Sequence, residues 1–214
     1  MAKSHKVSHG RKFGQVVQGA AAIFMRDGYA GASVDDIAQA AHVSKATLYS
    51  YFPDKPCMFQ EAMRAETARL EGSFTLDIPT DLDPAQAIPL ITSRIAEWLT
   101  DPAHVSLYRI HLAEAPRFGA LSTSFHDKVV QILHDAIRPH LDRWVDAGQL
   151  WLDDTGTATE QLIALTGAGL MDSLLLGQES PVRDAAVQSA AQLFLRAALP
   201  SPRQPNLRRN ARSR

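Results

Sequence analysis

The chain has 214 residues, of which 45% are hydrophobic and 7% aromatic, and its formal net charge at pH 7 is −1. No apolar segment is long enough to cross a bilayer, and a single cysteine cannot form an internal disulfide. The composition therefore excludes a membrane-spanning protein and a disulfide-stabilised secreted protein. Residues 1–12 are polar and basic with no apolar run after them, so no signal peptide is apparent and we expect the protein in the cytoplasm.

The charge is distributed unevenly along the chain. Residues 1–60 carry seven basic and four acidic side chains, and residues 203–214 carry five arginines and no acid. The intervening residues, 61–202, carry ten basic and nineteen acidic side chains. A basic head on an acidic body is typical of a protein that presents one face to a polyanion.

The first helix is predicted from about Arg11 to Asp27, because an apolar stripe recurs there at helical spacing. The stripe consists of Phe13, Val16, Val17, Ala20 and Phe24. We expect it to cover Ile37 and Leu48 of the following segment, and we expect Gly28 to end the helix.

Residues 33–55 are predicted to form two short helices joined by a tight turn, followed by the start of a third helix. Ser33 is placed to cap the first of them, and Asp35 lies in its first turn, where negative charge suits the helix dipole. Residues 42–43 form the joint, and Ser44 is placed to cap the second helix.

The second of these helices has a free face. Leu48 and Phe52 are spaced to point inward, which leaves Lys45, Ala46, Thr47, Tyr49 and Tyr51 to face outward. Such a small, hydroxylated and singly basic face suits the major groove of DNA, where lysine reaches phosphate or guanine and a methyl group contacts thymine. The geometry is that of a helix-turn-helix. Periodicity alone is equally compatible with an ordinary helical hairpin whose polar residues face solvent.

The residues themselves favour the first interpretation. The segment GYAGASVDDIAQAAHVSKATLYSYFPDK, residues 28–55, closely resembles the DNA-binding signature of the TetR family of bacterial transcriptional regulators. The similarity is dense from Phe13 to Phe59, and the caps, the joint and the inward positions all fall in register. Ala46 departs from the pattern, because many members of the family carry glycine there. Alanine is small enough for close approach to DNA, so the departure concerns sequence preference.

The resemblance implies an all-α protein with an N-terminal three-helix helix-turn-helix DNA-binding domain in residues 1–56. A helical effector-binding and dimerisation domain would follow in residues 57–199, and a basic tail, residues 200–214, has a composition typical of disorder. It implies a homodimer on a palindromic site in double-stranded DNA. The DNA-contacting residues implied are Lys45, Ala46, Thr47 and Tyr49 at the bases, Ser33, Tyr51 and Lys55 at the phosphates, and Ser44 at the start of the reading helix.

The body is predicted to be helical throughout. Apolar spacing predicts helices over about 55–72, 84–100, 102–115 and 122–147, with a linker at 75–84. We expect Pro116 to break the chain between the last two of these. The segment AEAPRFGAL, residues 113–121, and the long helix after it resemble the AefR-like branch of the family.

The last two predicted helices are assigned to self-association. Residues 162–176 are apolar nearly all round and therefore need covering on several sides, and residues 186–197 carry a face of small and large apolar side chains. Two such helices from each subunit would form a four-helix interface. The alternative is that both helices simply belong to the core of one subunit.

An effector site is expected in the acidic body. The candidate residues are Trp98, Tyr108, His111, Phe125 and Met171. Aromatic walls with a few polar groups suit a small apolar or aromatic molecule. For any one of these residues, an ordinary position in the core is the more common explanation.

Together these patterns predict a homodimeric, ligand-responsive transcriptional regulator, which in this family is most often a repressor. The sequence contains no ordered nucleophile–base–acid set, no GxSxG, no phosphate-binding glycine loop and no HExxH, so we expect no enzyme, no cofactor and no metal. The alternative is a structural DNA-binding protein of the same fold that responds to no inducer.

Overall fold

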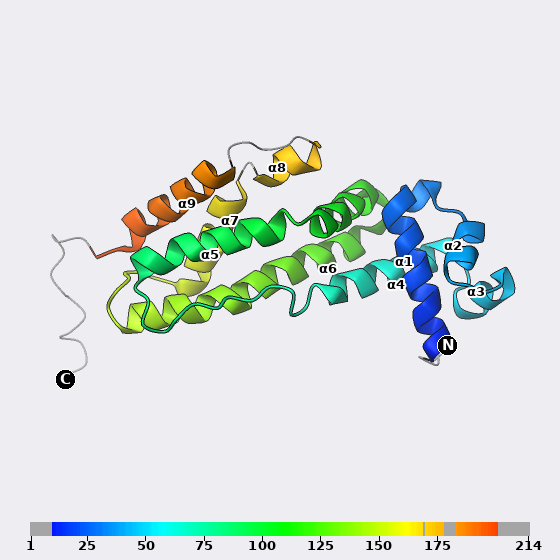
Figure 1. The fold of residues 1–214 in the computed structure, drawn as a ribbon, viewed down its shortest axis with the longest axis horizontal. Helices are drawn as coiled ribbons and strands as arrows, with labels where there is room; N and C mark the ends of the chain where they lie inside the picture. The colour runs from blue at the N-terminus through cyan, green and yellow to red at the C-terminus, as the bar shows by residue number, and fades with distance from the viewer. Residues whose placement is uncertain (1–9, 169, 178–182, 201–214) are drawn as a thin grey trace. The chain divides into compact units, whose positions relative to one another are not determined.

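A computed structural model describes residues 10–168, 170–177 and 183–200 of the chain. Within these ranges the chain forms nine α-helices and no strand (Figure 1), which confirms the predicted all-α class. In the same ranges no helix combines the length and the apolar character needed to cross a membrane. The predicted basic tail lies, from residue 201 onward, outside the described residues.

The chain is divided into two compact units, each built from two separate segments. The first unit comprises Met1–Ser73 and Pro102–Val129, and the second comprises Phe74–Asp101 and Val130–Arg214. The long helix α6 (Pro102–Asp146) contributes to both units. The domain boundary placed at residue 56 from the sequence remains a prediction.

Helix α1 (Arg11–Gly31) buries the apolar stripe that its sequence predicted. The regular helix ends at Gly28, as expected, because Gly28 has non-helical backbone (φ 70°, ψ 178°). One further turn, to Gly31, follows the kink. A positive φ is inexpensive only for glycine, which explains why the helix ends at this residue.

Helices α2 (Val34–Ala40), α3 (Lys45–Tyr51) and α4 (Lys55–Arg69) complete the N-terminal part of the first unit. Helix α4 begins as predicted, because the Asp54 carboxylate accepts the Cys57 amide N–H at 2.8 Å. It ends at Arg69, three residues earlier than expected.

Helix α1 contacts the turn that follows α2, and the contact on α1 is made at a glycine. A Cβ atom on Gly19 would lie 2.6 Å from the Ala41 amide nitrogen and 2.7 Å from the Ala41 Cβ. These distances are far below van der Waals contact, so only glycine allows the two backbones to approach so closely. The contact fixes α2 and α3 on the helix behind them.

The predicted break near Pro116 is confirmed. Helix α6 spans Pro102–Asp146 but consists of two helices that meet at the non-helical residue Phe118 (φ −125°, ψ 45°). The Ser122 Oγ donates to the His111 carbonyl at 2.8 Å, which a straight helix would not allow over eleven residues. The Phe118 ring lies 4.8 Å from the Phe59 ring and 5.2 Å from the Tyr29 ring, centroid to centroid. Proline removes one helical hydrogen bond and clashes with the preceding turn, which favours a break here. The break brings an aromatic side chain onto α1 and α4.

In the second unit, α5 (Pro84–Leu99), α7 (Thr155–Gly167) and α9 (Arg183–Ala198) pack side by side (Figure 1). The single helix predicted over 162–176 is wrong. It is divided into α7 and α8 (Leu170–Leu175), since Ala168 has extended backbone (φ −59°, ψ 122°). The adjacent glycines have low helix propensity, which explains the division there.

Candidate nucleic-acid interface and effector region

The joint between α2 and α3 is a tight turn around a left-handed residue. His42 has φ 52°. Its N–H donates to the Gln39 carbonyl at 3.0 Å, and the Val43 N–H donates to the Ala38 carbonyl at 3.0 Å. This pair of bonds is the Schellman motif, which ends a helix by turning the chain sharply. The turn sets the crossing of the two helices and was predicted at these two residues.

Serine hydroxyls cap both helices of the pair, as predicted. The Ser33 Oγ accepts the Asp36 N–H at 3.0 Å, and the Ser44 Oγ accepts the Thr47 N–H at 3.1 Å. The Ser44 and Thr47 hydroxyls also share a hydrogen bond of 2.9 Å. Because the Thr47 hydroxyl is held by the cap, its methyl group is left to contact a partner.

Helix α3 has one buried side and one open side. Leu48 is fully buried and Phe52, which follows the helix, is 6% exposed, as their spacing predicted. On the other side the described chain leaves Ser44, Lys45, Ala46 and Tyr49 exposed, and Tyr49 is 51% exposed.

Lys45, the first residue of α3, is held by an acidic residue of α2. Its Nζ lies 2.6 Å from the Asp35 carboxylate, and both side chains are more than half exposed. The hydrogen bond to Asp35 and the charge of that carboxylate raise the pKa of Lys45, so the side chain stays cationic. Sequence reasoning assigned Asp35 only to the helix dipole and missed this pair. The signal was available, because both residues occupy first turns of the two crossed helices.

The three residues predicted at the phosphates are half-buried. Ser33 caps α2, and the Tyr51 ring packs edge-on against Phe13 at 5.8 Å. Lys55, at the start of α4, places its Nζ 4.8 Å from the centroid of the Tyr29 ring. Each of these side chains is therefore positioned by α1 or by its own helix before any partner arrives.

Three of the five predicted effector residues gather on α6 in the first unit. The His111 ring stacks on the Phe125 ring at 4.2 Å with an interplanar angle of 2°, and Tyr108 meets Phe125 edge-on at 5.4 Å. Trp98 belongs to the second unit, where its ring packs against Phe74 at 5.4 Å. The side chain of Met171 lies outside the described residues. An effector role for these residues remains a prediction.

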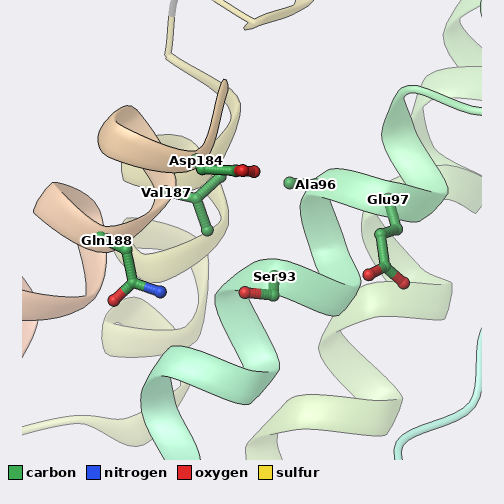
Figure 2. Close-up of a pocket in the computed structure, with 6 residues that line it drawn as sticks. All are labelled: Ser93, Ala96, Glu97, Asp184, Val187 and Gln188. Atoms are coloured by element: carbon green, nitrogen blue, oxygen red, sulfur yellow. The ribbon is translucent and has the colours of Figure 1, made fainter. Parts of the chain in front are cut away.

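A cavity of about 480 Å³ lies between α5 and α9 in the second unit. Figure 2 shows Ser93 and Ala96 on α5 facing Asp184, Val187 and Gln188 on α9, whereas the Glu97 side chain, also on α5, points away from α9. Ala96 and Val187 are buried together with Leu170, and the cavity lining also includes the acidic residues Glu97 and Asp184. Trp98, Tyr108, His111 and Phe125 are not among the described residues that line it.

Two family profiles match the chain. Residues 16–62 match the profile described as bacterial regulatory proteins of the tetR family, and residues 86–197 match the C-terminal domain of AefR-like transcriptional repressors. The first match covers the capped helix pair described above, and the second covers more than half of the chain. Among proteins with curated descriptions, none is significantly similar to this chain.

Solved structures of the same fold include the flavonoid-responsive regulator FrrA, which is 28% identical, with 91% of this chain and 100% of that chain covered and a TM-score of 0.66. A TetR family transcriptional regulator from Pseudomonas syringae pv. tomato str. DC3000 is 22% identical (91% and 100% covered, TM-score 0.68). A TetR transcriptional regulator from Agrobacterium tumefaciens is 19% identical (89% and 95% covered, TM-score 0.66). The last two show the fold alone. With both profiles in register with the helix-turn-helix and the helical body, the chain belongs to the TetR family of DNA-binding transcriptional regulators and is not an enzyme.

Proposed function

We propose that this protein is a homodimeric cytoplasmic repressor that binds a palindromic operator and leaves it when a small apolar or aromatic molecule binds. The observation that carries the proposal is the open side of α3, which presents Lys45, Ala46 and Tyr49 to solvent from a helix that is capped and anchored on its other side. The matched C-terminal profile, which is named for repressors, favours repression over activation.

In this proposal α3 enters the major groove. Lys45, Ala46, Thr47 and Tyr49 contact base edges, whereas Ser33, Tyr51 and Lys55 contact phosphates on either side and Ser44 holds the start of the helix. Lysine and hydroxyl groups are the usual donors to phosphate oxygens and guanine acceptors. The +3 balance of the first 60 residues adds attraction that does not depend on sequence.

The dimer is assigned to the last helices of the second unit. Leu193 on α9 is 52% exposed and Leu176, which follows α8, is 76% exposed. Large apolar side chains open to water on neighbouring elements are typical of a surface that a second subunit covers. A two-fold axis between such subunits would present two copies of α3 to two half-sites.

An aromatic effector is supported by two observations. Tyr108, His111 and Phe125 form a continuous set of rings in the first unit. The flavonoid-responsive regulator FrrA shares 28% identity with this chain over 91% of its length. Planar aromatic compounds are therefore the first class to test, and release from DNA would follow if the compound favours a spacing of the two heads that no longer matches the operator.

Selection of bound duplexes from a random DNA pool tests this function. The expected result is an inverted repeat whose half-sites lie about one helical turn, or a multiple of one turn, apart. A pool that shows no enrichment at low salt would contradict DNA recognition. If the chain selects a palindrome but no aromatic compound shifts its thermal unfolding or releases the duplex, the alternative of a constitutive DNA-binding protein is correct.

A further inference from the structure

His111 on α6 is a deeply buried polar side chain. The residue is 3% exposed, and neither ring nitrogen has a hydrogen-bond partner among the described residues. Buried polar groups in native proteins are nearly always hydrogen-bonded, because an unpaired one keeps the cost of leaving water. An imidazole with two unpaired nitrogens at such depth therefore needs an explanation beyond the packing of the core.

The geometry around the ring decides from which direction a partner can arrive. Phe125 lies flat against one face of the imidazole, at 4.2 Å and 2°. The nitrogen lone pair and the N–H bond lie in the plane of the imidazole, so both point parallel to the Phe125 ring and past its edge. A partner must therefore approach the edge of the stacked pair, where the edge-on contact between Tyr108 and Phe125 supplies another aromatic surface in the same cluster.

The neighbouring hydroxyl does not satisfy the imidazole. The Ser122 Oγ donates to the backbone carbonyl of His111 at 2.8 Å, so this hydroxyl serves the main chain. The His111 ring contacts Phe125, an apolar side chain, and the Tyr108 ring contacts Phe125 and the ring of the buried His104. A trapped water is stable only where two to four polar groups surround it, and a site whose ring neighbours are mainly aromatic is poorly suited to one.

The charge state of His111 limits the kinds of ligand group that its ring can bind. Burial lowers the pKa of His111 to about 4, so at neutral pH the ring carries one N–H donor and one lone-pair acceptor and no charge. An anionic partner would require the imidazolium, which burial disfavours. A neutral hydroxyl, which can donate to the bare nitrogen, fits the ring without that cost, and a hydroxyl on an aromatic ring also matches the aromatic surfaces beside it.

We propose that His111 is the hydrogen-bonding anchor for a planar, neutral phenol, whose hydroxyl donates to the imidazole edge while its ring packs beside Phe125 and Tyr108. This inference rests on the proposed function for the role of the compound as effector, but the binding site itself is independent of whether the protein binds DNA. The His111 imidazole is then the polar group by which the site distinguishes a phenol from an aromatic hydrocarbon of the same shape.

The experiment uses the full-length protein and three probes, 4-methylphenol, 2-naphthol and 4-phenylphenol, each compared with its methyl ether. Binding is measured by calorimetry with the wild type and with His111→Phe and His111→Gln. We expect at least one phenol to bind the wild type about tenfold more tightly than its ether, which is the effect of one buried hydrogen bond. His111→Phe should bind phenol and ether equally, at the affinity of the ether for the wild type, and His111→Gln should recover part of the preference.

Nitrogen spectra of histidine-labelled protein supply a second measurement that does not depend on the stability of a variant. The imidazole signals of His111, assigned by their loss in His111→Phe, should move when the phenol is added and stay in place when the ether is added. Equal binding of phenol and ether, or no binding of any of the three phenols, would overturn the proposal. So would His111 signals that already show a hydrogen bond in the free protein and do not respond to phenol, because a buried water would then hold the ring.

The two proposals fail separately. A chain that selects a palindrome from random DNA but shows no phenol preference keeps the proposed function and loses this site. A chain that binds phenols through His111 but selects no duplex keeps the site and loses the proposed function.

Discussion

Lys45 and Asp35 form an ion pair of 2.6 Å across the two helices of the helix-turn-helix, on the side that faces away from the core. The same ammonium is the basic group proposed to reach the DNA. In the free protein, Asp35 therefore occupies the position that a phosphate or a guanine acceptor would take. The pair holds the lysine in place, and its carboxylate opposes the approach of a polyanion.

We predict that Asp35→Asn tightens binding to all duplexes, operator and scrambled sequence alike. The substitution frees Lys45 and removes a negative charge beside the phosphates, so we expect an affinity gain of about two- to tenfold at low salt that shrinks as salt rises. Because the gain does not depend on base contacts, the ratio of operator to scrambled affinity should fall or stay constant. Fluorescence anisotropy at several salt concentrations measures both quantities.

Asp36→Asn is the matched control for that prediction. It removes the same charge one residue along α2, from a side chain that is not paired with Lys45. A smaller gain than that of Asp35→Asn is expected. Equal gains would show that net charge alone decides the affinity, and weaker binding by Asp35→Asn would show that Asp35 orients the lysine for DNA instead of competing with it.

Lys55→Ala should weaken binding to every sequence by a similar factor, since a phosphate contact carries no sequence information. Losing one phosphate contact in each subunit should also reduce the slope of log affinity against log salt by about 2 per dimer. The Lys55 side chain covers the Tyr29 ring, with Nζ at 4.8 Å from its centroid. Lys55→Met keeps the apolar stem over that ring, so the same loss in Lys55→Met assigns it to the charge, and unchanged affinity in both variants argues against a phosphate role.

Thr47→Ala should alter sequence preference more than overall affinity. The Thr47 hydroxyl is bonded to Ser44 at 2.9 Å, so the group proposed to meet DNA is its methyl, which suits a thymine methyl. Thr47→Val keeps that methyl and should retain the preference that Thr47→Ala loses. Repeating the selection from random DNA with both variants tests the contact. A preference lost in Thr47→Val as well would assign it to the hydroxyl or to the cap.

The features that sequence predicted well are those decided within one or two helical turns. Ser33 and Ser44 cap their helices as expected, because a capping bond joins residues three apart. Leu48 and Phe52 are buried as their spacing indicated. The outward side of α3 followed directly from those inward positions, so local spacing alone was enough to place most of the candidate interface.

The features that sequence could not predict depend on residues far apart in the chain. Pro116 predicted the break in α6, but no local pattern predicted that the break would place Phe118 against the Tyr29 and Phe59 rings. Whether position 19 requires glycine depends on Ala41, which the turn at His42 brings against it. No local pattern distinguishes such a glycine from one that is merely tolerated in a helix.

The difference between a glycine in close backbone contact and one that is merely tolerated predicts different effects of alanine on the free energy of unfolding. Gly19→Ala places a Cβ well inside normal contact with the Ala41 backbone, so we expect the free energy of unfolding to fall by roughly 1–3 kcal/mol despite the better helix propensity of alanine. Gly14→Ala is the control, since Gly14 lies in the same helix and no other described part of the chain comes within 4 Å of its Cβ position. It should stabilise the protein by about 0.5–1 kcal/mol. Equal effects of the two variants in urea unfolding would show that the close approach to Ala41 does not matter.

The pH dependence of stability offers a last check on His111. Its pKa is lowered to about 4 by burial, whereas in the unfolded chain a histidine titrates near 6.5. Above the pKa of the unfolded chain, His111 is neutral in both the folded and the unfolded state, so its titration does not reduce the free energy of unfolding. As the pH falls from about 6.5 to 4 the unfolded state takes up a proton that the folded state does not, so the free energy of unfolding should drop by up to about 3 kcal/mol. His140 contributes with the same sign, because burial and the nearby Arg143 lower its pKa.

Urea unfolding between about pH 7.5 and 4.5 measures this decline, with His111→Phe to remove the contribution and His126→Gln, an exposed position on the same helix, as control. His111→Phe should flatten most of the slope and, by removing an unpaired buried polar group, should unfold at higher urea than the wild type near pH 5. His126→Gln should leave the slope in place. The carboxylates whose pKa values are lowered, Asp27 and Asp154, lose their contribution only below about pH 4, so their titration falls outside this window. A slope that persists in His111→Phe would mean that the folded state already protonates His111, and the neutral imidazole on which phenol recognition depends would then be the wrong species.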